Sequence, residues 1–312
     1  MKTIALDNEK LRFHGRWSGD SHKMTGYWCR PYLEFKIQGK SFGFSTEGDS
    51  AVYSVKLDGS MLTNCSRSTG SLTFYMQDDK PHTIRITGLS TERPLIIKDL
   101  VIDGSLCEME KRSRHILFIG DSLTAANGYS AVIPEEMDWD YTCVALGGLP
   151  LCDGRGYYSL PEKEKDAVRT GMETAFYKLC PPSIAIKDAP DYDLSLAETP
   201  DDIFINLGTN DALINEENAK GYLEVYKEFV PKIRQLYPNA RIFLPLPSAD
   251  SDTKMRLSTI ESAAKNMEAT LDNVKYIDTR NWNIEISGDN VHPTAAGYAE
   301  YARRLIKAVG YR

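Results

Sequence analysis

The chain has 312 residues, 42% of them hydrophobic, which is enough for about two globular domains with substantial cores. Its 37 lysines and arginines against 44 aspartates and glutamates give a net charge of -7. This balance argues against a nucleic-acid partner, which needs a basic face, and fits a neutral substrate better. No stretch approaches the ~20 apolar residues of a membrane span, so no membrane association is expected.

The N-terminal residues do not have the pattern of a secretion signal, because the charged residues Asp7 and Glu9 interrupt the apolar segment that such a signal needs. The six cysteines are scattered and include no Cys-x-x-Cys pair. Free thiols in a reducing cytoplasm are therefore the preferred interpretation, and secretion is the alternative if a leader has been trimmed. The sequence indicates no particular oligomeric state.

Residues 1–108 show short segments in which aromatic and β-branched residues recur at every second position. Turn-forming pairs at 38–39, 58–59 and 78–79 separate them. Without a convincing helix, this pattern predicts an all-β sandwich domain, followed by a polar connection at 107–114. The expected strands are 11–17, 32–37, 41–45, 51–57, 71–76, 82–86 and 95–102.

Residues 113–312 instead alternate apolar strands with long amphipathic segments. The expected strands are 115–120, 141–146, 202–207, 241–246 and 274–278, and the expected helices are 163–179, 216–236, 253–271 and 294–309, the last opened by Pro293. This alternation predicts an α/β domain whose parallel five-stranded sheet has helices on both faces, in three α/β/α layers. In such sheets, chemistry collects at the carboxyl ends of the strands.

The first candidate for chemistry is Ser122, in the block GDSLT at the end of the apolar strand 115–120. Gly-Asp-Ser also occurs at 19–21 and 48–50, but only the third copy follows a strand that reads as buried. A serine hydroxyl there is a candidate nucleophile. The alternative is that Ser122 only caps the following helix.

A serine nucleophile needs a base, normally a histidine held by a third group. Three of the five histidines lie in the sandwich half, and His115 starts a strand at the end opposite Ser122. His292 remains, in a loop just before the final helix. Asp289, three residues earlier, can accept a hydrogen bond from the imidazole and fix its tautomer.

Oxyanion donors are expected after two further strands. Asn210, in NLGTND at 206–211, offers a side-chain amide, and its alternative role is to brace a turn. Gly148 offers a backbone N–H beside that of Ser122. The alternative donor is the N–H of the neighbouring Gly147, because either glycine of the doublet can fill this role. Asp121 and Asp211 are expected to be structural, the latter as a loop anchor.

These four blocks resemble the SGNH or GDSL hydrolase superfamily, whose name lists the serine, glycine, asparagine and histidine matched here. The resemblance implies a flavodoxin-like SGNH domain with Ser122 as nucleophile, His292 as base and Asp289 as its orienter. It also implies that Ser122, Gly148 and Asn210 form the oxyanion hole. The Gly-x-Ser-x-Gly elbow of ordinary α/β-hydrolases is missing, because Thr124 occupies its last position.

The segments FHGRW (13–17), YSVKLDG (53–59), YDLS (192–195) and TPDDI (199–203) look like carbohydrate esterase family 2. That family joins an N-terminal jelly roll to an SGNH domain and removes acetyl groups from plant polysaccharides or their oligosaccharides. The chain departs from the Asp-x-His-Pro often found in the family. It has Asp-x-x-His-Pro, the spacing general to the superfamily.

The resemblance implies a serine esterase acting on acetylated xylan, mannan or derived oligosaccharides. Trp282 and Tyr157 are candidate platforms for sugar, with packing beneath a loop as the alternative for each. No metal or cofactor is expected, because no histidine and cysteine cluster has ligand spacing. The rival functions are a lipase or thioesterase of the same superfamily, and a carbohydrate-binding protein with a relic hydrolase domain.

Overall fold

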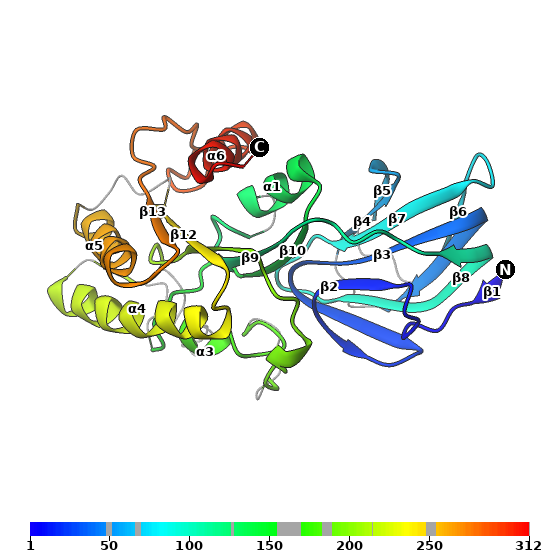
Figure 1. Ribbon diagram of the computed structural model, residues 1–312, viewed down its shortest axis with the longest axis horizontal. Coiled ribbons are helices and arrows are strands. Elements are labelled where there is room, and N and C mark those ends of the chain that lie inside the picture. Colours follow the sequence, from blue (N-terminus) through cyan, green and yellow to red (C-terminus); the bar gives the residue numbers. More distant parts are fainter. Residues whose placement is uncertain are drawn as a thin grey trace. The chain divides into compact units, whose positions relative to one another are not determined.

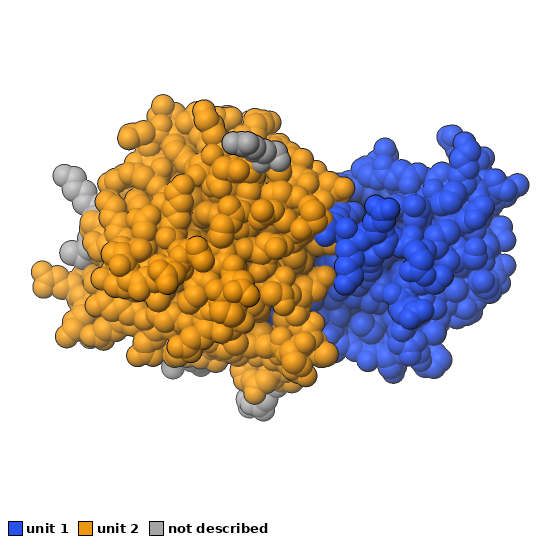
Figure 2. Space-filling view, in the orientation of Figure 1, with its two compact units in different colours: residues 1–112 blue, residues 113–312 orange. Residues whose placement is uncertain are grey.

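The structure, a computed structural model, describes residues 1–47, 52–65, 70–125, 128–154, 170–182, 189–213, 215–247 and 254–311. The chain forms two compact units, Met1–Arg112 and Ser113–Arg312, which are coloured separately in Figure 2. Among the described residues, no helix is both long and apolar enough to cross a bilayer. The mixed α/β organisation expected from the sequence is confirmed.

Unit 1 is built from strands, and its described residues include no helix (Figure 1). The strands are β1 (Lys2–Thr3), β2 (Arg12–Gly19), β3 (Lys23–Thr46), β4 (Tyr53–Leu57), β5 (Ser60–Cys65), β6 (Gly70–Tyr75), β7 (Pro81–Gly88) and β8 (Leu95–Cys107). Strand β1 pairs antiparallel with β8, and the long strand β3 pairs antiparallel with β2, β6 and β7. Strand β4 pairs antiparallel with both β5 and β7.

The turn expected at 58–59 is confirmed. Leu57 pairs with Ser60, so Asp58 and Gly59 form a two-residue hairpin turn. Their φ angles of 48° and 78° are both positive, as a type I′ turn requires. Strand β5, which follows this turn, was not expected because its sequence SMLTNC has no clear alternation.

The turn expected at 38–39 is wrong, because β3 runs through it and merges the two strands expected at 32–37 and 41–45. Gly39 lies opposite Gly104 of β8. A Cβ on Gly39 would come within 1.6 Å of the Asp103 carbonyl oxygen. Gly39 therefore allows the backbones of two paired strands to approach closely. In the sequence, a glycine with this role looks the same as one that marks a turn.

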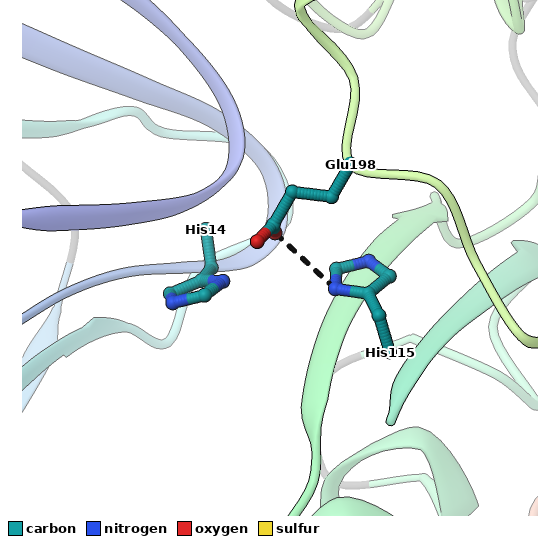
Figure 3. A group of neighbouring side chains, drawn as sticks. All are labelled: His14, His115 and Glu198. Carbon is teal, nitrogen blue, oxygen red and sulfur yellow. Dashed lines mark ion pairs between the residues drawn. The ribbon is translucent and has the colours of Figure 1, made fainter. Parts of the chain in front are cut away.

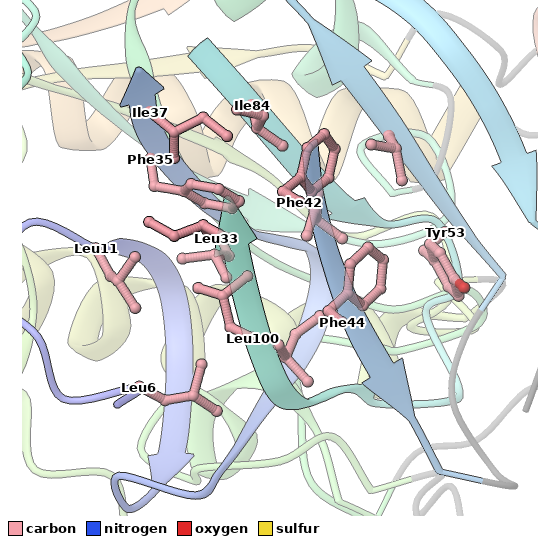
Figure 4. Packing of buried hydrophobic residues seen from close by; sticks show 14 of the residues in the cluster. Leu6, Leu11, Leu33, Phe35, Ile37, Phe42, Phe44, Tyr53, Ile84 and Leu100 are labelled. Atoms are coloured by element: carbon pink, nitrogen blue, oxygen red, sulfur yellow. The ribbon is translucent and has the colours of Figure 1, made fainter. Parts of the chain in front are cut away.

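The core of unit 1 consists of apolar side chains with almost no exposed surface, drawn in Figure 4. Phe42 is central, with its ring 5.9 Å from that of Phe35 and 5.0 Å from that of Phe74. Burial of each such side chain contributes roughly 1.5–3 kcal/mol to folding. Unit 1 therefore has a core of its own.

Unit 2 contains five strands, five α-helices and one 3₁₀ turn among its described residues. They are β9 (His115–Gly120), α1 (Tyr129–Met137), β10 (Asp140–Ala145), α3 (Met172–Ala175), the 3₁₀ turn Leu194–Leu196, β11 (Asp202–Asn206), α4 (Glu216–Leu236), β12 (Arg241–Pro245), α5 (Lys254–Thr270), β13 (Val274–Ile277) and α6 (Ala295–Val309).

The strands of unit 2 pair in the order β10, β9, β11, β12, β13, and each of these pairs is parallel. Helices α1 and α6 contact each other, as do α4 and α5, and Figure 1 shows α1 and α6 on the opposite side of the sheet from α4. The register places Gly120, Ala145 and Asn206 side by side at the carboxyl ends of three neighbouring strands. The segments that follow these residues therefore leave the sheet at one edge.

Two helix expectations for unit 2 need correction. The described part of the segment 163–179 holds only the four-residue helix α3, and residues 163–169 lie outside the described residues. Pro293 does not open the last helix but forms an isolated bridge with Ile286. Thr294 is the N-cap instead, because its hydroxyl accepts a hydrogen bond from the Gly297 N–H at 3.1 Å.

Candidate active site

Ser122 lies two residues beyond β9, a strand in which every residue is buried. The turn requires a glycine at position 120, since a Cβ there would lie 2.1 Å from Thr124 Oγ1 and 2.9 Å from the Asn206 carbonyl oxygen. Helix α1 begins only at Tyr129 with Gly128 as its N-cap, so Ser122 does not cap it. The half-buried serine is therefore held at the strand end without a capping role at this helix.

His292 and Asp289 complete a chain of hydrogen bonds with this serine. His292 Nε2 lies 2.8 Å from Ser122 Oγ, and His292 Nδ1 lies 2.6 Å from Asp289 Oδ2. The histidine side chain is 34% exposed and that of Asp289 is 50% exposed, so solvent reaches the pair. The structure thus brings together the three side chains singled out as nucleophile, base and orienter.

The loop that carries His292 organises itself around Asp289. Asp289 Oδ1 accepts hydrogen bonds from the N–H groups of Val291 and His292, both at 2.9 Å, and from Ser287 Oγ at 2.7 Å. These bonds hold the pKa of Asp289 well below its usual range, with the His292 N–H as the largest cause. Asp289 therefore remains a carboxylate, the form that accepts the imidazole N–H.

Asp121, next to Ser122, is fully buried. Its Oδ1 accepts a hydrogen bond from the Leu123 N–H at 3.0 Å, which holds the turn after β9. Burial, with a smaller contribution from the nearby Asp211, raises the pKa of Asp121 to about 7, although the hydrogen bond from the Leu123 N–H lowers it. This shift cannot be predicted from the residue types alone, because burial of a charged residue depends on tertiary packing.

Asn210 is buried beyond the end of β11, and its Nδ2 donates a hydrogen bond to the Leu149 carbonyl at 3.3 Å. A primary amide carries two N–H groups, so this bond orients the amide while using one of them. Asp211 accepts hydrogen bonds from the N–H groups of Leu151 and Cys152, which confirms its expected role as a loop anchor.

The Gly147-Gly148 doublet lies after β10, and Gly147 is beside Ser122. A Cβ on Gly147 would lie 3.8 Å from Ser122 Cβ, an ordinary van der Waals contact. Gly148 has a φ of +76°, a left-handed conformation that other residues rarely adopt. Of the two, only Gly148 therefore requires glycine for its backbone conformation.

His115, the other histidine of unit 2, lies at the opposite end of the sheet from Ser122, at the start of β9. Figure 3 shows the Glu198 carboxylate directed at its ring, with Nδ1 3.2 Å from Glu198 Oε2. The His115 Nε2 atom lies 3.1 Å from Thr142 Oγ1. Both ring nitrogens of His115 thus have local partners, as befits a residue outside the site.

The two candidate sugar platforms have different outcomes. Trp282 is half-buried, and its ring lies 5.4 Å from that of Tyr301, which is buried beneath it. Packing therefore accounts for one part of the indole, and another part remains accessible. Tyr157 lies outside the described residues.

No three histidine, cysteine, aspartate or glutamate side chains from a single unit gather at ligand distance among the described residues. Ser122 is instead joined by hydrogen bonds to an imidazole and through it to a carboxylate, and the segments that carry Asn210 and the glycine doublet leave the sheet at the same edge. This set can perform proton transfer and acyl transfer.

Comparison with known proteins agrees with this chemistry. A family model described as GDSL-like Lipase/Acylhydrolase matches residues 171–300. The matched region contains Asn210, Asp289 and His292 and begins after Ser122. No curated protein matches the chain.

Several solved structures share the fold over almost the entire chain. A family two carbohydrate esterase from Cellvibrio japonicus has a TM-score of 0.81 at 20% identity, covering 99% of this chain and 96% of the other. The acetyl xylan esterase Est2A from Butyrivibrio proteoclasticus has a TM-score of 0.79 at 17% identity, covering 99% and 97%. A family two carbohydrate esterase from Clostridium thermocellum in complex with cellohexaose has a TM-score of 0.78 at 18% identity, covering 97% and 100%.

The recognition made from the sequence is thus confirmed: residues 171–300 match the GDSL-like lipase/acylhydrolase family model, which supports a carboxylic ester hydrolase, and the chain shares its fold with solved carbohydrate esterase family 2 structures.

Proposed function

We propose that this protein is a serine esterase that removes O-acetyl groups from carbohydrates such as acetylated xylan, mannan or their oligosaccharides. The observation that carries the proposal is the hydrogen-bond chain from Ser122 Oγ through His292 to Asp289. The substrate class comes from the structural neighbours, one of which is an acetyl xylan esterase and another of which holds cellohexaose.

In the first half of the reaction, Ser122 Oγ attacks the acetyl carbonyl carbon while His292 Nε2 takes the hydroxyl proton. The carbonyl electron pair moves onto oxygen and gives a tetrahedral oxyanion. When this intermediate collapses, the bond to the sugar oxygen breaks, and His292 returns the proton to that oxygen. The sugar leaves with a free hydroxyl, and the acetyl group remains on Ser122.

In the second half, His292 Nε2 takes a proton from a water molecule that attacks the acetyl-enzyme. Collapse of the second tetrahedral intermediate releases acetic acid and returns the proton to Ser122 Oγ. Asp289, held ionised by its loop, stabilises the imidazolium that forms in each half. The proton transfers between Ser122 Oγ and His292 Nε2 therefore use the 2.8 Å hydrogen bond that joins them, and the 2.6 Å bond to Asp289 holds the imidazole in place.

The oxyanion is assigned to the Ser122 N–H, the Gly148 N–H and the Asn210 amide, with the Gly147 N–H as the alternative to Gly148. Support comes from the register, which brings the segments after β9, β10 and β11 to one edge. We also assign unit 2 to the flavodoxin-like α/β/α arrangement of SGNH hydrolases and unit 1 to the jelly roll that precedes it in carbohydrate esterase family 2.

The test is acetate release from acetylated xylan and mannan oligosaccharides by wild type, Ser122→Ala and Ser21→Ala. Ser21 is a matched control because it ends another Gly-Asp-Ser tripeptide, in unit 1. Ser122→Ala is expected to lower kcat by about 10⁴-fold or more, and Ser21→Ala is expected to retain wild-type kcat.

Full activity of Ser122→Ala would overturn the mechanism. A preference for octanoyl over acetyl esters would instead favour a lipase or thioesterase of the same superfamily. Sugar binding without acetate release by the wild type would indicate a binding protein with a relic hydrolase domain. The position from which acetate is lost can be read by NMR.

A further inference from the structure

Asp211 is a fully buried carboxylate that the proposed acyl-transfer steps do not use. Its Oδ2 accepts a hydrogen bond from the Leu151 N–H and its Oδ1 one from the Cys152 N–H, both at 2.9 Å. About 60 residues of chain separate the carboxylate from these donors. It therefore fastens the segment after β10 to the turn after β11.

Asn210 reinforces this link from the adjacent position, because its Nδ2 donates to the Leu149 carbonyl. Two consecutive side chains of one turn thus hold three of the four residues 149–152. The residues held begin directly after the Gly147-Gly148 doublet, which the Leu149 N–H closes by donating to the Leu146 carbonyl at 3.3 Å.

The turn that carries Asp211 is itself constrained. The Asp211 N–H donates to the Gly208 carbonyl at 3.3 Å, and Asn218 Nδ2 donates to the Ala212 carbonyl at 2.8 Å. Ala212 has a φ of +52°, which is rare for an alanine. The turn that carries the Asp211 carboxylate therefore has hydrogen bonds of its own, which do not involve residues 149–152.

Oxyanion donors act only when they are in place before charge develops, within about 0.5 Å of the productive geometry. The glycine doublet, the Asn210 amide and Ser122 come from three different strand ends. Asp211 is positioned to set the spacing between the first two, and Gly147 adjoins the third. A carboxylate suits this task, because its oxygens accept both N–H groups in charge-assisted bonds.

We propose that Asp211 is a positioning residue for the esterase reaction, which holds the chain at 151–152 so that the glycine N–H and the Asn210 amide converge on one oxyanion. This inference rests on the proposed function.

The experiment compares Asp211→Asn with Asp202→Asn. Both aspartates are fully buried, but Asp202 lies at the amino end of β11, where it pairs with Arg114 and Arg241. An asparagine at 211 has one acceptor for two N–H groups and directs an NH₂ at the other. We expect Asp211→Asn to lower kcat for p-nitrophenyl acetate by about 10–100-fold, with KM within about threefold and the acid limb of the pH profile unchanged. Asp202→Asn is expected to lose thermal stability and keep its kcat per folded molecule.

A double-mutant cycle with Asn210→Ala measures the coupling between the two residues in kcat, and a general loss of stability does not change this coupling. If Asp211 acts through the oxyanion donors, the double variant loses less kcat than the product of the single losses. Multiplying losses, or a folded Asp211→Asn variant with wild-type kcat, would overturn the inference. If Asp211→Asn does not fold, Asp211→Glu is used, which keeps charge and acceptors but displaces them by one methylene. A lowered kcat then supports positioning, and an unchanged kcat overturns it.

Ser122→Ala separates the two proposals. If Ser122→Ala is inactive and Asp211→Asn retains full kcat, the esterase assignment stands and the inference about Asp211 fails. If Ser122→Ala is fully active, the proposed function itself fails.

Discussion

His292 Nε2 lies 2.8 Å from Ser122 Oγ, although 170 positions of the sequence separate the two residues. Asp289, by contrast, is only three residues from His292. Its carboxylate is hydrogen-bonded to the His292 ring and to the backbone N–H groups of Val291 and His292. His292 and Asp289, the proposed base and its orienter, therefore form one local unit, and the sheet brings Ser122 to it.

Replacement of Asp289 by asparagine tests the orienter. Asparagine can still accept one backbone N–H, but it cannot stabilise an imidazolium by charge. We expect kcat to fall by about 10²–10⁴-fold with little change in KM. Asp278→Asn is a suitable control, because this carboxylate pairs with Arg280 on the surface. Equal kcat in Asp289→Asn and wild type would show that the carboxylate is dispensable.

The two glycines of the doublet predict different responses to alanine. At Gly148 the φ of +76° makes alanine strained, so Gly148→Ala should lower both the melting temperature and kcat. At Gly147 a Cβ meets only Ser122 Cβ at 3.8 Å, so Gly147→Ala should fold normally. Melting temperatures and p-nitrophenyl acetate kinetics of the two variants provide the check, and equal loss of stability in both would contradict the expectation.

Asp121 predicts an unusual dependence of stability on pH. Its pKa is about 7 in the folded protein against an ordinary value of 3.8, so between these values the native state keeps a proton that the unfolded chain has lost. The free energy of unfolding therefore falls as pH rises from about 4 to 7, by at most ~1.4 kcal/mol per pH unit from this group. Asp121→Asn should reduce this decline, which urea unfolding at pH 4.5, 6 and 7.5 can measure.

The matched control for that experiment is Asp20→Asn, the aspartate of another Gly-Asp-Ser tripeptide. The N–H groups of His22 and Lys23 lower the pKa of Asp20, so its contribution to stability has the opposite sign. Its contribution is lost as pH falls and is present above the unfolded pKa. A wild-type pH dependence in Asp121→Asn would contradict the assignment of the decline to Asp121.

Trp282 predicts a separation between sugar substrates and small esters. If the exposed part of the indole supports a sugar ring, Trp282→Ala should raise KM for acetylated xylan oligosaccharides by about tenfold and leave p-nitrophenyl acetate kinetics nearly unchanged. Trp139→Ala is the comparison, since Trp139 is buried against Tyr311 with ring centroids 4.6 Å apart. Equal effects of Trp282→Ala on both substrates would indicate packing on Tyr301 alone.

Elements with strong periodicity were predictable from sequence. Strand β9 and helix α4 have the bounds expected, and α4 is capped by Asn215, which accepts the Asn218 N–H at 2.8 Å. Helix α1 was missed because most of its length is buried and it contains Pro134, so it shows no apolar stripe. Local pattern reveals helices with one buried face better than helices buried on several sides.

The candidate site was predictable where each residue type has few competitors. His292 could be singled out because only five histidines exist, and Asn210 because it follows a buried strand. The hydrogen bonds of Asp211 could not be foreseen, because its partners are backbone groups, and any sequence supplies those. The raised pKa of Asp121 likewise depends on its complete burial, and an aspartate next to a serine in the sequence does not indicate that it is buried.

The place of β9 between β10 and β11 also bears on how activity returns after denaturation. The helices of unit 2 have local hydrogen bonds, but β9 is complete only when strands on both sides have docked, one of them from much later in the chain. Pairing of distant strands is the slow part of folding. During refolding, ester hydrolysis should therefore recover later than the helical circular dichroism signal. The delay between the two would measure how long β10 and β11 take to pair with β9.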